Sequence, residues 1–466
     1  MKSLLRKIID TGLLCTLCMT MTAQPVNQKS IEWFKDAKFG LFLHWGLYSQ
    51  TAGDWKGRPA RGGAHFMLQE RIPLKEYALI ANDFNPVGYN AKEWVKVAKK
   101  AGMKYIVITS KHHDGFAMYD SQCSDYNIVK RTPYAKDPMK ELVAACHKQG
   151  LKFGFYYSLG RDWEDPDVPT NWPVKGGRSN TWDYPNEDNK NLSAYIERKV
   201  KPQLRELLTN YGKIDIIWFD TPELVTISQS KEIRELIHSI QPDCLINARI
   251  GNGLGDFTIS EQVFPEQINN TPWESCITMG KSWDYNRYDT VYKKPDVIIR
   301  HLVDIVSKGG NLLLNITPDG SGRFPKLTQP GLEALYNWMN KNGEAIYKSK
   351  PWRTFGENLD VTTQAEKLNK DFNDAIYDGT PQAIIPDFRY TAKKNCVYVI
   401  VRHVKDTTFI LHSFKKSDEV KAVECLGEND KIIWQMTDNG LSITLNNPIS
   451  AFPIYTLKVT LHNNQQ

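Results

Sequence analysis

The chain has 466 residues, of which 41% are hydrophobic and 24% are charged, a composition typical of folded globular proteins and unlike that of disordered ones. Its formal net charge is +6, but lysine and arginine are spread along helical stretches, which argues against a nucleic-acid partner. This length corresponds to about two to four domains, unless an α/β barrel takes about 250 residues as one. The aromatic share of 11% fits a packed core, and also platforms for the apolar faces of sugars.

The first 23 residues have the pattern of a secretory signal peptide. Lys2, Arg6 and Lys7 precede a short apolar run that ends at Ala23, and two cysteines in that run leave lipoprotein anchoring as a weaker alternative. No later segment reaches the roughly 20 apolar residues of a membrane span. We therefore expect an exported protein, periplasmic or secreted. The cysteines after residue 23 form no CxxC pair and fit no zinc module, so we expect mostly buried free thiols.

From residue 30 to about 345, short apolar segments alternate with amphipathic helical patterns. The expected strands are 39–45, 104–109, 152–158, 214–220, 244–249 and 311–316. Strand, helix and strand repeated in this way predict a parallel sheet, and the length favours a (β/α)8-like barrel over an open sheet. We assign residues 24–345 to this α/β domain.

A long polar segment, residues 162–191, follows the third expected strand. Its Trp163, Trp172 and Trp182 favour a lid or a cleft wall, because loops of this length are usually functional or disordered. Beyond about residue 350 the pattern changes to short alternating strands separated by turns. This predicts an all-β sandwich over residues 352–462.

Polar residues close the expected barrel strands, and barrels of this kind carry their active sites at the carboxyl ends of the strands. These residues are His44, His112, His113, Tyr156, Tyr157, Asp220, Arg249 and Asn315. Each alone has a structural explanation, such as a helix N-cap, but their convergence on one rim predicts a polar site.

The adjacent pair His112 and His113 does not by itself predict a metal site. Neighbours on one strand point to opposite faces unless the strand has ended, and no third-ligand spacing accompanies the pair. Hydrogen bonds to neighbouring hydroxyl groups of a sugar suit the two imidazoles better. We therefore expect no metal and no cofactor.

Asp220 follows the apolar and aromatic run IIWF. A carboxylate at a barrel mouth with aromatic walls suits a glycosidase nucleophile, which works with a second carboxyl group about 5–5.5 Å away for retention or about 6.5–9.5 Å for inversion. Candidates for that second group are Glu261, Glu266 and Glu274, and the spacing does not choose among them.

Seven segments occur in an order that resembles glycoside hydrolase family 29, whose members are retaining exo-α-L-fucosidases. They are LFLHWGLYS, ITSKHHDGFAMYDS, FGFYYS, IIWFD, NARIGNGLGDFTISEQ, WESCITMGKSW and SKGGNLLLNITPDGSG. The resemblance spans about residues 28–345. It implies a (β/α)8-like barrel followed by a β-sandwich, and hydrolysis of terminal α-L-fucose from a glycan through a covalent fucosyl ester on an aspartate.

The resemblance also implies roles for single residues. Asp220 matches the nucleophile, and Glu261 in GDFTISE matches the acid/base, with Glu266 and Glu274 as alternatives. Cys276 lies in a signature segment but has no chemical role in this mechanism. Substrate contacts are expected from His44, His65, His112, His113, Tyr156, Trp218, Arg249 and Trp283.

Two positions depart from the family pattern. Some members carry a Glu–Trp pair in the loop after the first strand, where this chain has Ala64 and His65, so one carboxylate contact to the sugar is lost and His65 is its expected replacement. The family's SWGY is SWDY here, with Asp284 in place of glycine.

Two alternative functions remain beside a fucosidase. An α-L-galactosidase acts on a sugar that differs by a hydroxyl group at C6, which an apolar pocket rejects only weakly. A catalytically inactive sugar-binding protein is disfavoured because both carboxylates are present. The expected partner is a fucosylated glycan, with no nucleic acid and no membrane span; linkage, aglycone and oligomeric state stay open.

Overall fold

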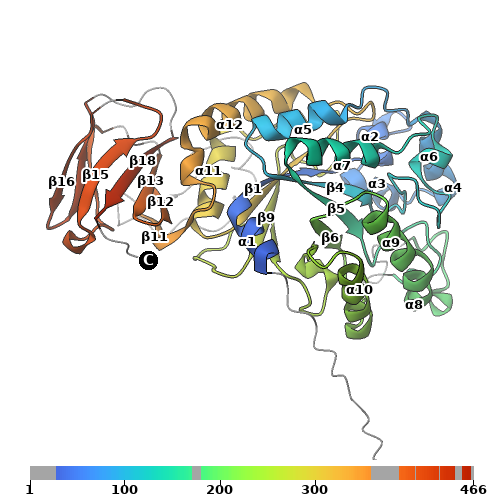
Figure 1. Ribbon diagram of the computed structural model, residues 1–466. Coiled ribbons are helices and arrows are strands. Elements are labelled where there is room, and N and C mark those ends of the chain that lie inside the picture. Colours follow the sequence, from blue (N-terminus) through green and yellow to red (C-terminus); the bar gives the residue numbers. More distant parts are fainter. Residues whose placement is uncertain are drawn as a thin grey trace, which may run out of the picture.

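The structure is a computed structural model that describes residues 28–170, 180–357, 388–402, 404, 406–429, 431–446 and 454–462. The expected signal peptide and Trp172 lie outside these residues. Within the described part of the chain, no helix is long and apolar enough to span a membrane. Figure 1 shows a sheet surrounded by helices, with a smaller domain of strands beside it.

Eight parallel strands form the barrel, as expected from the alternation of strands and helices. They pair in the order β7-β6-β5-β4-β1-β10-β9-β8, and an isolated parallel bridge between Asn247 and Phe257 joins the two ends of this order. The strands are β1 (Phe39–Leu43), β4 (Tyr105–Lys111), β5 (Lys152–Ser158), β6 (Ile216–Asp220), β7 (Leu245–Ile246), β8 (Thr258–Glu261), β9 (Trp273–Thr278) and β10 (Asn311–Ile316). Six of them lie where the sequence predicts strands, and β8 and β9 are additional.

Helices cover the outside of most of the barrel (Figure 1). The longer ones are α5 (Ala91–Lys100), α7 (Pro138–Gln149), α9 (Lys201–Thr209), α10 (Ile227–Ile240), α11 (Pro295–Ser307) and α12 (Gln329–Asn342). Helix α7 shows how the sequence sets their ends: the Asp137 carboxylate caps two backbone N–H groups, Pro138 follows in the first turn, and Gly150 ends the helix in a left-handed conformation. In contrast, β7, β8 and β9 follow one another with only a short 3-10 turn, Ala248–Ile250, between the first two.

Helix α1 (Gln28–Ala37) closes the amino-terminal end of the barrel. Phe34 on α1 is fully buried, and its ring centroid lies 4.4 Å from that of Phe257 and 6.1 Å from that of Tyr105. Inward-facing side chains such as Phe42 and Trp218 continue this apolar core through the barrel. Because this end is filled, the carboxyl ends of the strands are the end of the barrel at which a site can open.

The carboxyl-terminal domain consists of two antiparallel sheets, and its sandwich architecture is as predicted. One sheet has the order β11-β12-β13-β18-β15 and the other β14-β17-β16. Their strands are β11 (Lys350–Glu357), β12 (Phe388–Lys393), β13 (Cys396–Arg402), β14 (Thr408–Leu411), β15 (Val420–Cys425), β16 (Ile433–Thr437), β17 (Gly440–Thr444) and β18 (Ile454–Leu461). The six cysteines of the described residues are free, and four of them are buried.

The sandwich packs against α11 and α12 of the barrel domain (Figure 1). The buried Arg389 of β12 donates from Nε to Asp304 Oδ1 on α11 at 2.8 Å. Trp338 of α12 donates from its indole nitrogen to the carbonyl of Ile454 at 3.0 Å. These buried contacts hold the two domains together.

Candidate active site

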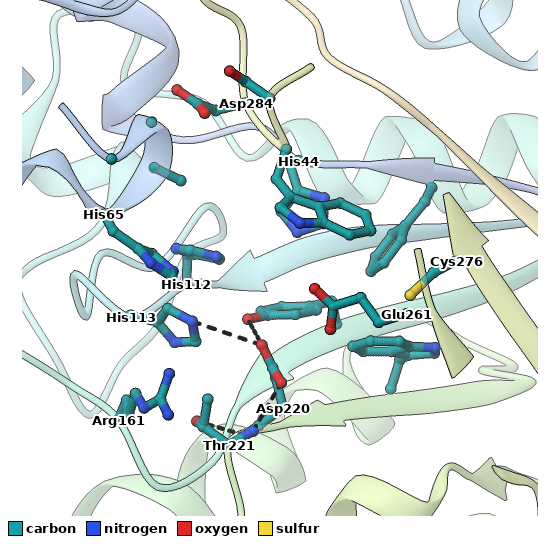
Figure 2. Close-up of a pocket in the computed structure, with 18 of the residues that line it drawn as sticks. His44, His65, His112, His113, Arg161, Asp220, Thr221, Glu261, Cys276 and Asp284 are labelled. Carbon is teal, nitrogen blue, oxygen red and sulfur yellow. Dashed lines mark hydrogen bonds and ion pairs between the residues drawn. The ribbon is translucent and has the colours of Figure 1, made fainter. Parts of the chain in front are cut away.

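A pocket of about 640 Å³ opens at the carboxyl ends of the barrel strands. Figure 2 shows the polar side chains that face into it. Of the residues expected to form the site, those in its lining are His44, His65, His112, His113, Tyr156, Trp218, Asp220, Arg249, Glu261, Cys276 and Trp283. Glu266 and Glu274 are not part of the lining.

Asp220 is the last residue of β6, and its carboxylate is held from several sides. The Tyr156 hydroxyl donates to Oδ2 at 2.8 Å, Arg249 Nη1 donates to Oδ1 at 2.8 Å, and His113 Nε2 lies 3.6 Å from Oδ2. Burial alone would raise the pKa of Asp220, but the Arg249 guanidinium and the Tyr156 hydrogen bond outweigh it, so the pKa lies below its usual value. The carboxylate is therefore ionised at neutral pH.

Glu261, the last residue of β8, shares Arg249 with Asp220. The second terminal nitrogen of Arg249, Nη2, donates to Glu261 Oε2. The Glu261 side chain is 40% exposed, whereas that of Asp220 is 18% exposed. Figure 2 shows both carboxylates directed into the same space. One guanidinium thus bridges a sheltered carboxylate and a solvent-accessible one.

Aromatic rings lie beneath these charges. The ring of Trp218 stacks on that of Tyr156, with centroids 5.6 Å apart and planes 20° apart, and the Arg249 guanidinium lies 5.1 Å from the Trp218 ring centroid. The Trp218 indole donates to Glu274 Oε1 at 2.9 Å, and Tyr105 donates to the other oxygen of the same carboxyl group. Glu274 is fully buried in the barrel interior, where burial raises its pKa to about 7.

Glu266 lies away from the pocket. It is exposed on the connection between β8 and β9, and its charge acts on Lys308, which precedes β10 at the opposite end of the barrel. Of the three glutamates left open by the sequence, the structure brings only Glu261 to Asp220.

Four histidines face the pocket (Figure 2). His44 directly follows β1, and its Nδ1 lies 2.7 Å from Asn315 Oδ1. His112 and His113 follow the last residue of β4, and His65 ends a 3-10 turn, Gly63–His65, in the loop after β1. Burial lowers the pKa of His44 to about 4 and those of His112 and His113 well below their usual value. The neutral rings can both donate and accept hydrogen bonds, as sugar hydroxyl groups require.

Comparisons with known proteins identify the family to which the chain belongs. Residues 18–344 match the family described as Alpha-L-fucosidase, and residues 382–460 match the Alpha-L-fucosidase C-terminal domain. The chain belongs to the alpha-L-fucosidase family of glycoside hydrolases. The resemblance to family 29 that the sequence motifs indicate is therefore confirmed.

Several known alpha-L-fucosidases are similar to this chain over most of its length. The tissue alpha-L-fucosidase of Rattus norvegicus is 29% identical over 462 residues, which cover 93% of this chain and 90% of the rat protein. The structure of alpha-L-fucosidase isoenzyme 1 from Paenibacillus thiaminolyticus is 30% identical, with a TM-score of 0.79 over 93% of this chain and 99% of that chain. An alpha-L-fucosidase from Lactobacillus casei, in complex with alpha-L-fucose product, is 37% identical, with a TM-score of 0.64 over 68% of this chain and 99% of that chain.

Arg161 and Asp284 also line the pocket, but strand-end reasoning did not single them out. Arg161 follows β5 and pairs with Glu223 at 2.6 Å; its place three residues beyond a strand end is the signal that would have found it. Asp284, noted only as a departure from the family motif, is buried in the pocket wall, and its Oδ1 has no hydrogen-bond partner among the described residues. Burial raises the pKa of Asp284 to about 7.

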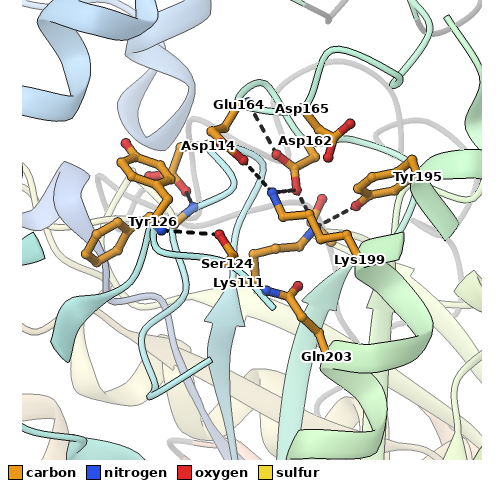
Figure 3. A network of polar contacts seen from close by, with 12 residues as sticks. Lys111, Asp114, Ser124, Tyr126, Asp162, Glu164, Asp165, Tyr195, Lys199 and Gln203 are labelled. Atoms are coloured by element: carbon orange, nitrogen blue, oxygen red, sulfur yellow. Dashed lines mark hydrogen bonds and ion pairs between the residues drawn. The ribbon is translucent and has the colours of Figure 1, made fainter. Parts of the chain in front are cut away.

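A buried ionic network fixes the segment that carries Arg161 and Trp163 (Figure 3). The Lys111 ammonium at the end of β4 lies 2.8 Å from Asp162 Oδ2, and Lys199 Nζ lies 2.8 Å from the same oxygen and 2.6 Å from Glu164. The Trp163 backbone N–H donates to the carbonyl of His113 at 2.7 Å. The described part of the long polar segment therefore forms a wall anchored behind the pocket histidines.

Proposed function

We propose that this chain is a retaining exo-α-L-fucosidase in which Asp220 is the nucleophile and Glu261 the acid/base. The bridge Asp220–Arg249–Glu261 at the pocket carries the proposal, because it joins two carboxylates in different environments within reach of one substrate. Relatives from Lactobacillus casei have been solved with alpha-L-fucose product and with Fuca(1,6)GlcNAc, which supports a terminal fucosyl group as the substrate.

The two steps of hydrolysis follow from these environments. The ionised Asp220 attacks C1 of the sugar, and Glu261 protonates the departing glycosidic oxygen. Glu261 then takes a proton from water, which attacks C1 of the fucosyl ester and frees Asp220. Retention requires a carboxyl separation of about 5–5.5 Å, which two carboxylates bound to the ends of one guanidinium can meet. Arg249 also moderates their mutual repulsion.

Contacts to the sugar come from the rest of the lining. We expect His44, His112 and His113 to present neutral imidazoles to the hydroxyl groups, and His65, which also lines the pocket, to replace the carboxylate contact that the loop lacks. Trp218 and Trp283 supply apolar surface for the ring and the C5 methyl group. An α-L-galactosidase would need to place a further hydroxyl group at this apolar side, so fucose is the preferred substrate.

We also propose export of the protein, supported by the order of basic, apolar and small residues in positions 1–23. Mass spectrometry of the protein recovered from its native cell would show a chain that begins near residue 24. An N-terminus at Met1 in the mature protein would contradict export by this route.

The nucleophile is tested by Asp220→Asn. The amide is nearly isosteric but cannot form the glycosyl ester, so turnover of an aryl α-L-fucoside should fall by at least about 10³-fold while the thermal unfolding temperature stays close to that of the wild type. Asp243→Asn, a half-exposed carboxylate after α10, is the matched control and should retain wild-type turnover. Retention of more than a few per cent of turnover in Asp220→Asn would remove this assignment.

The stereochemistry and the sugar are tested together. Proton NMR during cleavage of an aryl α-L-fucoside should show α-L-fucose as the first product, and initial β-L-fucose would contradict retention. An aryl α-L-galactoside assayed in parallel should be cleaved more slowly. Faster cleavage of the galactoside would favour that alternative, and binding of fucose without any cleavage would favour an inactive sugar-binding protein.

A further inference from the structure

Three histidines of the pocket converge from two separate segments. His65 comes from the loop after β1, and His112 and His113 come from the turn after β4. One ring nitrogen of each lies within 4.8 Å of the corresponding nitrogens of the other two. The ring centroids of His112 and His113 are 4.2 Å apart, and those of His65 and His113 are 5.0 Å apart. Figure 2 shows the three rings side by side on one wall.

The strand ending explains why the sequence argues against such a cluster. Side chains at adjacent positions of a strand point to opposite faces. Strand β4 ends at Lys111, however, so His112 and His113 lie on the turn beyond it, and both rings reach the same side. The third ring, that of His65, lies at the loop position that departs from the family pattern. Because His65 is distant in sequence from His112 and His113, no residue spacing indicates the cluster.

A second observation points to a ligand at this place. His112 is only 5% exposed, yet its Nδ1 has no hydrogen-bond partner among the described residues. A buried polar atom without a partner costs free energy, which a ligand able to bond to it would recover. His113 is oriented differently: Ser158 Oγ lies 2.6 Å from its Nδ1, which leaves Nε2 facing the pocket.

We propose that His65, His112 and His113 form a binding site for Zn²⁺ or a similar divalent transition-metal cation, and that the bound cation excludes sugar from the pocket. Three imidazoles with an open fourth position are a common zinc donor set, with Zn–N distances of about 2.0–2.1 Å. A tetrahedral ion brings its nitrogens to about 3.4 Å from one another. The distances between the nitrogens shorten to this value when the half-buried His65 side chain rotates toward the other two rings.

The charges around the three histidines influence the affinity of the cluster for a cation. Asp220 Oδ2 lies 3.6 Å from His113 Nε2 and favours a cation, whereas the guanidinium groups of Arg161 and Arg249 also line the pocket and oppose it. Hard cations such as Mg²⁺ prefer oxygen ligands and gain little from imidazoles. The site should therefore select Zn²⁺ over Mg²⁺, and it overlaps with the atoms that would bind the sugar hydroxyl groups.

Direct metal binding is measured on the purified full chain after treatment with a chelator. Titration with Co²⁺ should produce the strong visible absorption of a tetrahedral ion, and Zn²⁺ should abolish that absorption. His65→Phe keeps an aromatic ring in place and should weaken Zn²⁺ binding at least about 10-fold. His147→Phe, at the carboxyl end of α7 and the opposite end of the barrel, is the matched control and should leave Zn²⁺ affinity unchanged.

Competition with sugar is the second measurement, and it rests on the proposed function. Zn²⁺ should raise the apparent KM for an aryl α-L-fucoside without changing kcat, excess chelator should reverse the effect, and Mg²⁺ should have none. Equal Zn²⁺ affinity of the wild type and His65→Phe, or inhibition that lowers kcat alone, would overturn the proposal. Tetrahedral Co²⁺ binding that depends on His65, in a chain that cleaves no fucoside, would uphold the metal site and reject the proposed function instead.

Discussion

Asp220 and Glu261 share one arginine but differ in what surrounds them. Asp220 is held by Tyr156, Arg249 and the nearby His113, which keep it ionised and fixed, as a nucleophile requires. Glu261 is more exposed and is held by Arg249 alone among the contacts described above. A residue that gives and takes a proton in each cycle benefits from such access to water.

The role of Glu261 predicts a difference between substrates. An aryl leaving group needs little protonation, so Glu261→Ala should slow cleavage of a fucosylated glycan about 10²–10⁴-fold and spare an aryl α-L-fucoside far more. Added azide should rescue the second step by attacking C1 of the fucosyl ester in place of water, and should yield α-L-fucosyl azide. Glu266→Ala is the control, because Glu266 lies away from the pocket. If Glu266→Ala or Glu274→Ala showed this pattern and Glu261→Ala did not, the acid/base role would belong to that residue.

Glu274 predicts a pH dependence of stability. Its pKa is about 7 in the folded chain against 4.5 ordinarily, so the folded state holds a proton that the unfolded state has lost. This contribution, about 3 kcal/mol, is complete below pH 4.5 and disappears as the pH rises through about 7. Urea unfolding of Glu274→Gln, which has no proton to lose, should show a smaller fall in stability between pH 5 and pH 7.5.

Burial also raises the pKa of Asp284 to about 7, so Asp284 likewise lowers the stability of the fold as the pH rises. This contribution of Asp284 remains in Glu274→Gln. An unchanged slope in Glu274→Gln would mean that Glu274 is ionised in the folded chain.

The sequence anticipates those site residues that end strands or stand in motifs. Asp220 and Arg249 follow apolar strands, and their positions at the rim come from the barrel topology alone. Arg161 and Asp284 lie in loops, whose paths depend on tertiary contacts such as the one between Lys111 and Asp162. A local sequence pattern does not predict such long-range contacts.

At the level of elements, the sequence predicts six barrel strands and misses β8 and β9 for different physical reasons. Strand β8 is short, and its side chains are exposed or half-exposed, so it lacks the apolar character of a barrel strand. Strand β9 is fully buried but contains Glu274 and Ser275. A buried carboxyl group is tolerated there because Tyr105 and Trp218 donate to it.

The ionic network behind the pocket predicts a linked loss of stability and binding. Asp162→Ala leaves the buried Lys111 without its carboxylate, so the free energy of unfolding should fall by about 3–5 kcal/mol. The same change frees the segment with Arg161 and Trp163, so KM for a fucoside should rise more than kcat falls. Glu76→Ala, which removes an exposed pair with Lys56, should alter neither quantity. A stability loss with unchanged KM would show that the network has no part in shaping the pocket.

At the level of the whole molecule, the sandwich supports the barrel through a buried charge pair. Of the two ion-pair partners of Asp304 among the described residues, Arg389→Met leaves Lys308, at 2.9 Å, and the change should lower the free energy of unfolding by about 3 kcal/mol. The turnover number at low temperature should stay near that of the wild type, because all the pocket residues belong to the barrel domain.

Lys341→Ala is the matched control for that interface, since Lys341 joins α12 to Glu428 by an exposed pair. Lys341→Ala should lower the free energy of unfolding by at most about 1 kcal/mol. Comparable losses from the two variants, measured by urea unfolding, would contradict a special role for the buried pair.

The absence of helices between β7, β8 and β9 has a consequence for how such enzymes diversify. Asp220 stands on a strand with neighbours on both sides and helices before and after it, so a change in its position would disturb much of the core. Glu261 stands on a strand that is joined to β7 through one short 3-10 turn and to β9 by a loop, and insertions and deletions are tolerated in such connections without repacking. Descendants of this chain can therefore exchange the proposed proton donor and the outer pocket wall, and with them the glycan they accept, while they inherit the proposed nucleophile unchanged.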